Sequence, residues 1–347
     1  MKTQCYPGDM RTSDFSFDLP PEAIAQRPAE PRDSARLMAV RRAAGSVTHH
    51  IFRDLPDLLR PGDLLVFNDT RVMAARLHGT RADTGGAVEA LLVRPMTDLR
   101  WQVLFRPARA AVHGREFLFP TAAGPLRAVA VARDESTVEL EFDRPFDPAT
   151  VGEVPLPPYI RGYEGDPERY QTVYSREARS AAAPTAGLHF TPALLEALAA
   201  RGIERAPVTL EVGPGTFRPV TAEDPREHAL HEEHVTVPAA TAAAIQRAKV
   251  EGRRVIAVGT TVVRTLEHVA RERGQVEPYV GWTRLKILPG DAFAVIDALI
   301  TNFHLPQSTL LMLVCAFAGT GLVLRAYEEA VATGYRFYSF GDAMLLE

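Results

Sequence analysis

The chain has 347 residues, which is more than one hydrophobic core usually serves, so we expect two domains. With 46% hydrophobic and 24% charged residues, its composition is that of a globular protein. The net charge of −4 excludes a general electrostatic attraction to nucleic acid. Only three of its 39 basic residues are lysines, so any RNA site must be a local patch of arginine, whose planar fork pairs well with phosphate.

The sequence shows no sign of secretion or membrane insertion. Cys5 and Cys315 stand near opposite ends of the chain, which fits neither a disulfide framework nor a zinc site. The first thirty residues have no apolar core, and the run 309–319 is shorter than the ~20 apolar residues that span a bilayer. We expect a cytoplasmic monomer with no membrane contact.

Short strands of alternating hydrophobicity dominate residues 63–142. They recur about every 8–12 residues between Gly, Pro and Asp turn signals, which is typical of an antiparallel barrel or sandwich. A proline-rich stretch follows. We expect an inserted antiparallel β-barrel domain over residues 60–150, with strands at 64–67, 88–93, 101–105, 116–119, 126–132 and 137–142.

After about residue 185, strands and helices alternate, which is typical of α/β layers. Thr191 and Pro192 are residues that favour a helix start, and Gly252 and Gly274 favour helix ends. Residues 1–59 and 151–347 should therefore form a discontinuous α/β catalytic domain with a mixed sheet. The expected strands are 207–212, 255–258 and 298–303, and the expected helices are 192–201, 238–251, 261–273, 308–318 and 323–333.

Two glycine-containing segments indicate contact with a ligand. In Pro184–Thr191 a turn leads into a helix N-terminus, whose free N–H groups attract carboxylate or phosphate; a capping turn with a packed histidine is the alternative. The Glu-Val-Gly-Pro-Gly that precedes Thr216 resembles a methyltransferase nucleotide loop, but Pro219 would break the helix that must follow. Gly213 and Gly215 still indicate close backbone approach.

Histidines three residues apart occur in His228-Ala-Leu-His231-Glu-Glu-His234. On a helix they would share a face and could bind a metal, but the spacing matches no zinc motif. Imidazoles that titrate near neutral pH suit general acid–base catalysis, with Glu233 orienting one of them. A solvated polar run is the alternative.

The remaining polar candidates lie at two later strand ends. Gly259-Thr260-Thr261 feeds a strand into a helix, with Arg264 one turn inside. Asp297, Asn302 and His304 lie towards the ends of an apolar strand, and ligands bind beyond the carboxyl ends of strands in open α/β sheets. A buried, satisfied polar pair is the alternative for Asn302 and His304.

Several segments between about residue 14 and the C-terminus carry a family resemblance: Pro31–Leu37, Asn68–Val72, Leu156–Ile160, Ala183–Thr191, Gly215–Val220, the His-x-x-His-x-Glu ending at Glu233, Arg264–Glu267, Asp297–Pro306 and Ser339–Met344. Together they resemble the S-adenosylmethionine:tRNA ribosyltransferase-isomerase family of queuosine biosynthesis. Pro214, Leu230 and Val262 stand where this family usually has Leu, Met and Ser, and they remove no expected proton-transfer group.

The resemblance implies a reaction. The ribosyl part of the co-substrate S-adenosylmethionine is transferred to 7-aminomethyl-7-deazaguanine at the tRNA wobble position and isomerised to epoxyqueuosine, releasing adenine and methionine without a metal or other cofactor. The sulfonium acidifies the C5′ protons, so one base can start the reaction, and one acid must protonate the departing adenine. An anticodon base is exposed in its loop and can be recognised by stacking and edge contacts.

We expect the site in the α/β domain, with little contact between S-adenosylmethionine and the barrel. The expected acid–base residues are His228, His231 and Glu233, with Asp297 and His304 as the rival pair. An S-adenosylmethionine-dependent RNA methyltransferase and a non-catalytic RNA-binding protein are the alternative functions. The expected substrate-binding residues are Thr185, Gly187, His189, Gly213, Gly215, Thr216, Arg218, Thr260, Arg264 and Asn302.

Overall fold

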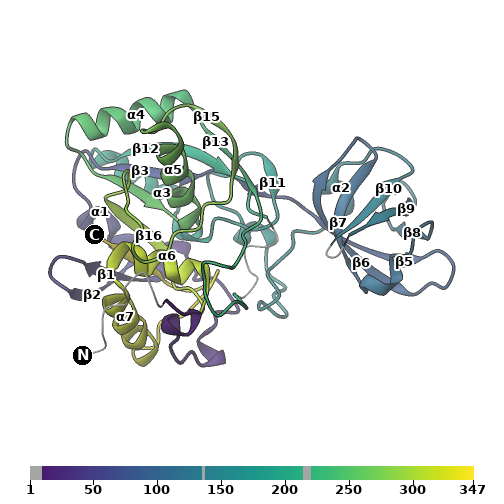
Figure 1. The fold of residues 1–347 in the computed structure, drawn as a ribbon, viewed down its shortest axis with the longest axis horizontal. Helices are drawn as coiled ribbons and strands as arrows, with labels where there is room; N and C mark the ends of the chain where they lie inside the picture. The colour runs from purple at the N-terminus through teal and green to yellow at the C-terminus, as the bar shows by residue number, and fades with distance from the viewer. Residues whose placement is uncertain (1–9, 135–136, 214–219) are drawn as a thin grey trace. The chain divides into compact units, whose positions relative to one another are not determined.

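The computed structural model describes residues 10–134, 137–213 and 220–347, and the elements below are counted over these residues. The chain divides into two compact units. The smaller comprises Arg71–Pro157 and Ala178–Ala182, and the larger comprises the rest. The larger unit contains a mixed sheet with helices and the smaller a closed antiparallel barrel (Figure 1), so the predicted fold class is confirmed.

Six strands of the described residues close the barrel of the smaller unit. Buried and less buried positions alternate along each strand, so one side of every strand faces a common apolar core. In barrel order the strands are β10 (Val138–Phe142), β7 (Arg100–Arg106), β6 (Ala87–Pro95), β5 (Arg76–Arg81), β8 (Glu116–Phe119) and β9 (Leu126–Arg133). The unit also contains η5 (Ala108–Ala110), α2 (Pro148–Val151) and the paired strands β4 (Arg71–Val72) and β11 (Ala178–Ser180).

The larger unit is built on a sheet that has nine strands within the described ranges. Their order is β15 (Tyr279–Thr283), β13 (Glu233–Val237), β12 (Glu204–Leu210), β3 (Leu64–Asn68), β14 (Val255–Val258), β16 (Ala298–Asn302), β17 (Ala343–Leu346), β1 (Arg36–Arg41) and β2 (Ser46–Ile51). The four central neighbours from β12 to β16 pair in parallel. Their carboxyl ends therefore meet at one edge of the sheet.

The strand β3 belongs to this central sheet, so the prediction that placed residues 64–67 in the barrel is wrong. All five of its residues are buried, because helices cover both faces of the sheet. A strand buried on both faces is a continuous apolar run rather than an alternating one, which is typical of central parallel strands. The barrel unit accordingly begins at Arg71.

Helices cover both faces of the sheet, and successive strand residues serve two different cores (Figure 1). Leu64 and Val66 pack with α4 (Ala239–Val250), α5 (Thr260–Arg273), α6 (Thr309–Ala318) and α7 (Thr320–Ala332). Leu65 and Phe67 pack with α1 (Leu55–Leu58) and α3 (Pro192–Ala200). The remaining helical turns are η1 (Thr12–Phe15), η2 (Pro21–Ala23), η3 (Arg32–Ser34), η4 (Phe52–Asp54), η6 (Pro167–Tyr170) and η7 (Thr185–His189).

The local signals read from the sequence set several helix ends. The hydroxyl of Thr191 accepts a hydrogen bond from the Leu194 N–H at 3.1 Å and caps α3. Gly274 ends α5 with a φ of 81°, a left-handed conformation that favours glycine. Within the described chain, no single helix is long and apolar enough to cross a membrane, and the consecutive helices α6 and α7 are bent by 117° between them.

At the amino ends of the parallel strands, a buried ion pair ties β3 to β14. The Arg254 guanidinium donates to both carboxylate oxygens of Asp63, at 2.9 and 2.6 Å, and to Glu347 at 2.8 Å. The Asp63 side chain is only 3% exposed. Hydrogen bonding to Asp63 raises the pKa of Arg254. Because Glu347 follows β17, the same guanidinium also holds that strand.

We predict that Asp63→Asn lowers the free energy of unfolding by about 3 kcal/mol, because it leaves a largely buried guanidinium without its main anion. Urea denaturation measures this loss. The matched control is Asp57→Asn, since the Arg201–Asp57 pair is 52% and 67% exposed. Removing that surface pair should cost less than about 1 kcal/mol, and equal losses in the two variants would contradict the prediction.

Candidate functional site

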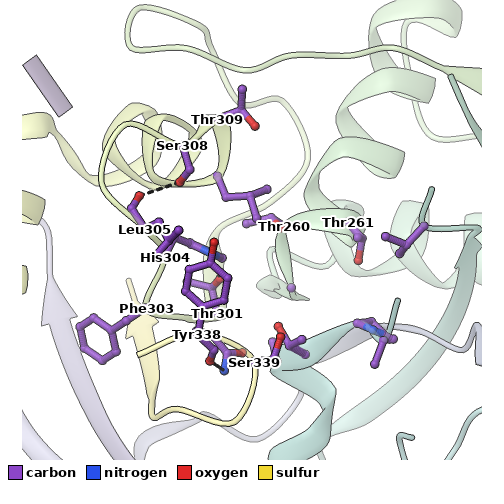
Figure 2. A pocket seen from close by; sticks show the side chains of 18 of the residues that line it. Thr260, Thr261, Thr301, Phe303, His304, Leu305, Ser308, Thr309, Tyr338 and Ser339 are labelled. Atoms are coloured by element: carbon purple, nitrogen blue, oxygen red, sulfur yellow. Dashed lines mark hydrogen bonds between the residues drawn. The ribbon is translucent and has the colours of Figure 1, made fainter. Parts of the chain in front are cut away.

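A pocket opens at the carboxyl ends of β14 and β16 (Figure 2). Its unfilled space, counted out to the solvent, is about 910 Å³, which is enough for a small-molecule ligand. We call it the first pocket. All of its described lining residues belong to the larger unit: Ala183–Ala186, Val212, Gly259–Thr261, Thr301–Pro306, Ser308–Leu310, Tyr338 and Ser339.

Two helices begin in the wall of the first pocket. Gly259 precedes α5 with a φ of 96°, and this sharp turn places Thr260 and Thr261 in the lining. Ser308 caps α6 by accepting a hydrogen bond from the Leu311 N–H at 3.2 Å. Figure 2 shows the first turns of both helices beside the same space. A ligand in this space would therefore experience the partial positive charge of both helix N-termini.

Asn302, at the end of β16, offers this pocket an unused acceptor. Its Nδ2 donates to the Tyr338 carbonyl at 3.0 Å and contacts His189 Nε2 at 3.3 Å, which fixes the orientation of the amide. Its Oδ1 is buried and has no hydrogen-bond partner among the described residues. An unsatisfied buried acceptor costs about 1–3 kcal/mol, so this position suits a ligand that donates a hydrogen bond.

His189 lies behind Asn302 and is absent from the described lining of the first pocket. It stacks on Phe52 with ring centroids 4.9 Å apart. Burial, assisted by the positive charges of Arg336 and Arg32, lowers the pKa of His189 to about 3. The neutral ring accepts from Asn302 through Nε2, so its proton is on Nδ1. The geometry makes His189 a positioning residue and not a cation for a substrate anion.

Of the other predicted residues in this region, Thr185 and Thr260 line the first pocket, whereas Gly187 does not. A Cβ at Gly187 would lie 2.0 Å from the Tyr174 hydroxyl and 2.9 Å from the Thr172 methyl group. The absence of a side chain there allows η7 to pack closely on residues 172–174. The glycine that the sequence assigned to the substrate is therefore explained by packing.

His304 lines the first pocket as a neutral imidazole. Its Nε2 is 2.9 Å from the Thr301 hydroxyl, and its backbone N–H donates to the Tyr327 hydroxyl at 3.1 Å. Burial lowers the pKa of His304 to about 3. The predicted polar end of β16 is thus part of the pocket.

Asp297 does not form the predicted pair with His304. It precedes β16 and therefore lies at the opposite edge of the sheet, about 16 Å of extended strand away. There its carboxylate accepts from Lys249 Nζ at 2.9 Å and from the Val255 N–H at 2.8 Å. The prediction is wrong because the two ends of one strand face opposite edges.

A second pocket adjoins the first, since Thr309 and Leu310 line both. Its unfilled space, counted out to the solvent, is about 710 Å³. It contains five of the predicted residues that the first pocket leaves out, namely Gly213, His228, His231, Glu233 and Arg264. Its described lining residues are Gly213, His228–His231, Glu233, Arg264, Leu285–Ile287, Thr309, Leu310 and Leu313.

The segment that carries His228 and His231 is a loop leading into β13, so the two histidines do not share a helix face. Lys286 holds this loop, because its Nζ donates to the carbonyls of Pro225, Arg226 and His228 at 2.6, 2.8 and 2.7 Å. Burial lowers the pKa of His228, helped by Lys286 and His231. At neutral pH His228 is therefore an unprotonated imidazole.

Glu233 forms an ion pair with Arg264, where the sequence suggested a histidine partner. Arg264 Nη1 donates to Glu233 Oε2, and the Gly213 N–H donates to Oε1 at 3.2 Å. The two charged side chains are only 4% and 7% exposed. Arg264 also donates through Nε to the Leu285 carbonyl at 2.9 Å. The pair joins β13 to α5 and forms one wall of the second pocket.

The predicted residues Gly215, Thr216 and Arg218, and the departure at Pro214, lie outside the described residues. Within the described ranges, no group of three or more His, Cys, Asp or Glu side chains could hold a metal ion.

Asn68, which organises the strand ends, was not among the site residues predicted from the sequence. Asn68 Nδ2 donates to the Leu210 carbonyl at 3.1 Å and to the Thr261 hydroxyl at 3.2 Å, and Oδ1 accepts from the Leu210 N–H at 3.1 Å. Asn68 thereby joins the ends of β3 and β12 to the first turn of α5. Asn68 is a polar residue at the end of an apolar strand, and this pattern could have identified it. Ser308, Tyr338, Ser339 and Lys286 were also missed.

Comparison with known proteins identifies relatives over nearly the whole chain. Residues 12–346 match the family described as "Queuosine biosynthesis protein". Proteins named S-adenosylmethionine:tRNA ribosyltransferase-isomerase from Symbiobacterium thermophilum and Moorella thermoacetica are 54% and 52% identical, over 97% of this chain and 100% of each relative. The crystal structure of S-adenosylmethionine tRNA ribosyltransferase from Thermotoga maritima aligns with a TM-score of 0.58 and 41% identity, covering 96% of this chain and 100% of that one.

We predict that His189 and His304 destabilise the fold in acid. Both have a folded-state pKa of about 3 against an ordinary value of 6.5, so below pH 6.5 the unfolded chain binds protons that the folded chain does not. Their contribution is complete above pH 6.5 and is lost as the pH falls towards 3. Each should contribute at most about 1.4 kcal/mol per pH unit.

Urea denaturation at pH 7, 6 and 5 measures this dependence. His304→Gln keeps a polar side chain beside Thr301 but cannot titrate, so its stability should fall less steeply than that of the wild type. Circular dichroism at pH 7 controls for folding of the variant. Superimposable slopes for wild type and His304→Gln would contradict the assignment of a neutral His304.

Proposed function

Because the chain belongs to the queuosine biosynthesis protein family, we propose that it transfers the ribosyl group of S-adenosylmethionine to tRNA and isomerises it. The observation that carries this proposal is full-length identity of 54% and 52% to relatives that bear the name of that activity. The proposed acceptor is 7-aminomethyl-7-deazaguanine at the wobble position. The products are epoxyqueuosine in tRNA, adenine and methionine. We propose that the protein acts as a monomer in the cytoplasm.

The first pocket is the proposed place for the adenosine half of S-adenosylmethionine. Leu305, Pro306 and Tyr338 give it apolar and aromatic walls, which suit a flat base. The unused Oδ1 of Asn302 can accept a hydrogen bond from the adenine amino group or a ribose hydroxyl. The described lining of both pockets belongs to the α/β unit. We therefore propose that the chemistry takes place in that unit and that the barrel makes little contact with S-adenosylmethionine.

The proposed acid–base residues are His228 and His231, which line the second pocket beside the first. A neutral imidazole takes a proton from C5′, which the adjacent sulfonium acidifies. The resulting imidazolium is the proton donor that adenine needs when its bond to C1′ breaks. The aminomethyl nitrogen of the acceptor forms the new bond to the ribosyl group and loses a proton to solvent. Methionine leaves as a neutral thioether when the C5′–S bond breaks and the epoxide closes. A partly enclosed site limits competing reactions with water.

Product analysis tests the proposed function. The protein is incubated with labelled S-adenosylmethionine and tRNA carrying the 7-aminomethyl-7-deazaguanine base. We expect adenine, methionine and a tRNA nucleoside that carries the modified ribosyl group, and no turnover with tRNA that has guanine at the wobble position. S-adenosylhomocysteine as product would establish a methyltransferase instead. No consumption of S-adenosylmethionine would contradict the proposed function and is the result that the non-catalytic alternative predicts.

We predict that His231→Ala lowers kcat at least about a hundredfold, the low end for loss of a general acid or base, while S-adenosylmethionine binding changes less than about twofold. Steady-state kinetics with precursor tRNA and calorimetric titration of S-adenosylmethionine measure the two effects. The matched control is His234→Ala. His234 is on β13 and is absent from the described lining of both pockets. Its Nδ1 lies 3.4 Å from Glu211 Oε1.

The comparison between variants identifies the base. His228→Ala should also lower kcat if the two histidines act as one proton-transfer pair. If His231→Ala and His228→Ala both turn over at nearly the wild-type rate, the loop is structural and the base must be sought around His304.

A further inference from the structure

The second pocket contains a buried hydrogen-bond donor that the described residues leave unused. Arg264 donates through Nε to the Leu285 carbonyl and through Nη1 to Glu233, but its Nη2 has no partner among them. The side chain is only 7% exposed. A guanidinium nitrogen that is hidden from solvent and lacks an acceptor is costly, so its position favours a ligand that brings one.

The charges around this pocket favour an anion. Its described lining contains Arg264 and Lys286 as cations and Glu233 as the carboxylate, which leaves one net positive charge. The N–H groups of Lys286 are directed at the three loop carbonyls, so Lys286 acts on a ligand through its charge alone. Arg264 Nη2 remains as the group that can donate hydrogen bonds. One positive charge and a planar donor match a carboxylate.

The rest of the pocket suits a short aliphatic chain. Leu230, Leu285, Ile287 and Leu313 provide apolar lining, and Leu310 is shared with the first pocket. A ligand can therefore extend from one pocket to the other past the first turn of α6. A flexible chain that ends in a carboxylate can reach Arg264 through this apolar space. A tRNA backbone phosphate, which is fixed between two bulky nucleosides, is a poor match for such a buried donor.

We propose that the second pocket binds the methionyl arm of S-adenosylmethionine, with its carboxylate hydrogen-bonded to Arg264 Nη2. This inference rests on the proposed function and deepens it. With adenosine in the first pocket, the sulfonium and C5′ lie where the two pockets meet, next to Thr309 and Leu310. His228 and His231 line the methionyl side of that junction. Binding energy from both arms then fixes the reacting carbon beside the proposed base.

Calorimetric titration with two ligands tests the inference without tRNA. Decarboxylated S-adenosylmethionine keeps the adenosine, the sulfonium and the amine but lacks the carboxylate. The wild type should bind S-adenosylmethionine about 10- to 100-fold more tightly than the decarboxylated ligand, which is the range for a hydrogen bond between charged groups.

Arg264→Lys keeps a cation for Glu233 but removes the Nη2 donor. It should weaken S-adenosylmethionine binding about tenfold or more and change binding of the decarboxylated ligand less than about twofold. The double variant Arg264→Met with Glu233→Gln removes both charges together, leaves no buried charge unpaired and should show the same selective loss. Arg271→Lys, on the same helix but absent from the described lining of both pockets, should alter neither affinity.

Each other result overturns the inference in an identifiable way. Equal weakening of both ligands would give Arg264 a purely structural role, and equal wild-type affinities would place the carboxylate elsewhere. If Arg264→Lys left S-adenosylmethionine binding intact but weakened precursor tRNA binding, a phosphate would be the occupant. The protein could release adenine and methionine and yet bind the two ligands equally well. That result would refute the inference but not the proposed function.

Discussion

Parallel pairing of β12, β3, β14 and β16 is the constraint on which the site depends. Central strands covered on both faces by helices have no water to satisfy their backbone groups, so their register must be complete. Complete register aligns the carboxyl ends of segments that are up to about 230 residues apart in sequence. Asn68 then fixes two of these ends to α5, and the polar residues that follow the strands must gather beyond one edge.

Burial decides what each polar side chain at that edge can do. His189 is held neutral and in one tautomer, so it orients Asn302 rather than attracting an anion. The buried pair of Glu233 and Arg264 joins β13 to α5 and fixes the Arg264 guanidinium in the wall of the second pocket. His231 is exposed and His228 is half-buried, so solvent reaches both imidazoles. In the proposed mechanism, positioning and proton transfer are therefore assigned to different residues.

The sequence was informative where the signal is local. The alternation of the barrel strands, the Thr191 cap and the Gly274 terminus each depend on neighbouring residues, and the structure contains them. Contacts between residues that are far apart in the sequence could not be predicted from it. The direction of β16 places Asp297 at the edge of the sheet opposite the pockets. Glu233 forms its ion pair with Arg264, which lies 31 positions later in the chain. The family resemblance supplied the reaction, but the contacts of Glu233 and the packing role of Gly187 required the structure.

The place of β17 has a consequence for how the protein folds during synthesis. This strand lies between β16 and β1, so Leu37 pairs with Ala343 across nearly the whole chain. The β1–β2 hairpin leaves the ribosome early but cannot join the sheet until residues 343–346 have been translated. Pairing of such distant segments is slow, because a very long loop must close first. Until then β1 and β16 each expose an unpaired edge, and the nascent chain is most open to wrong strand pairing at those two edges.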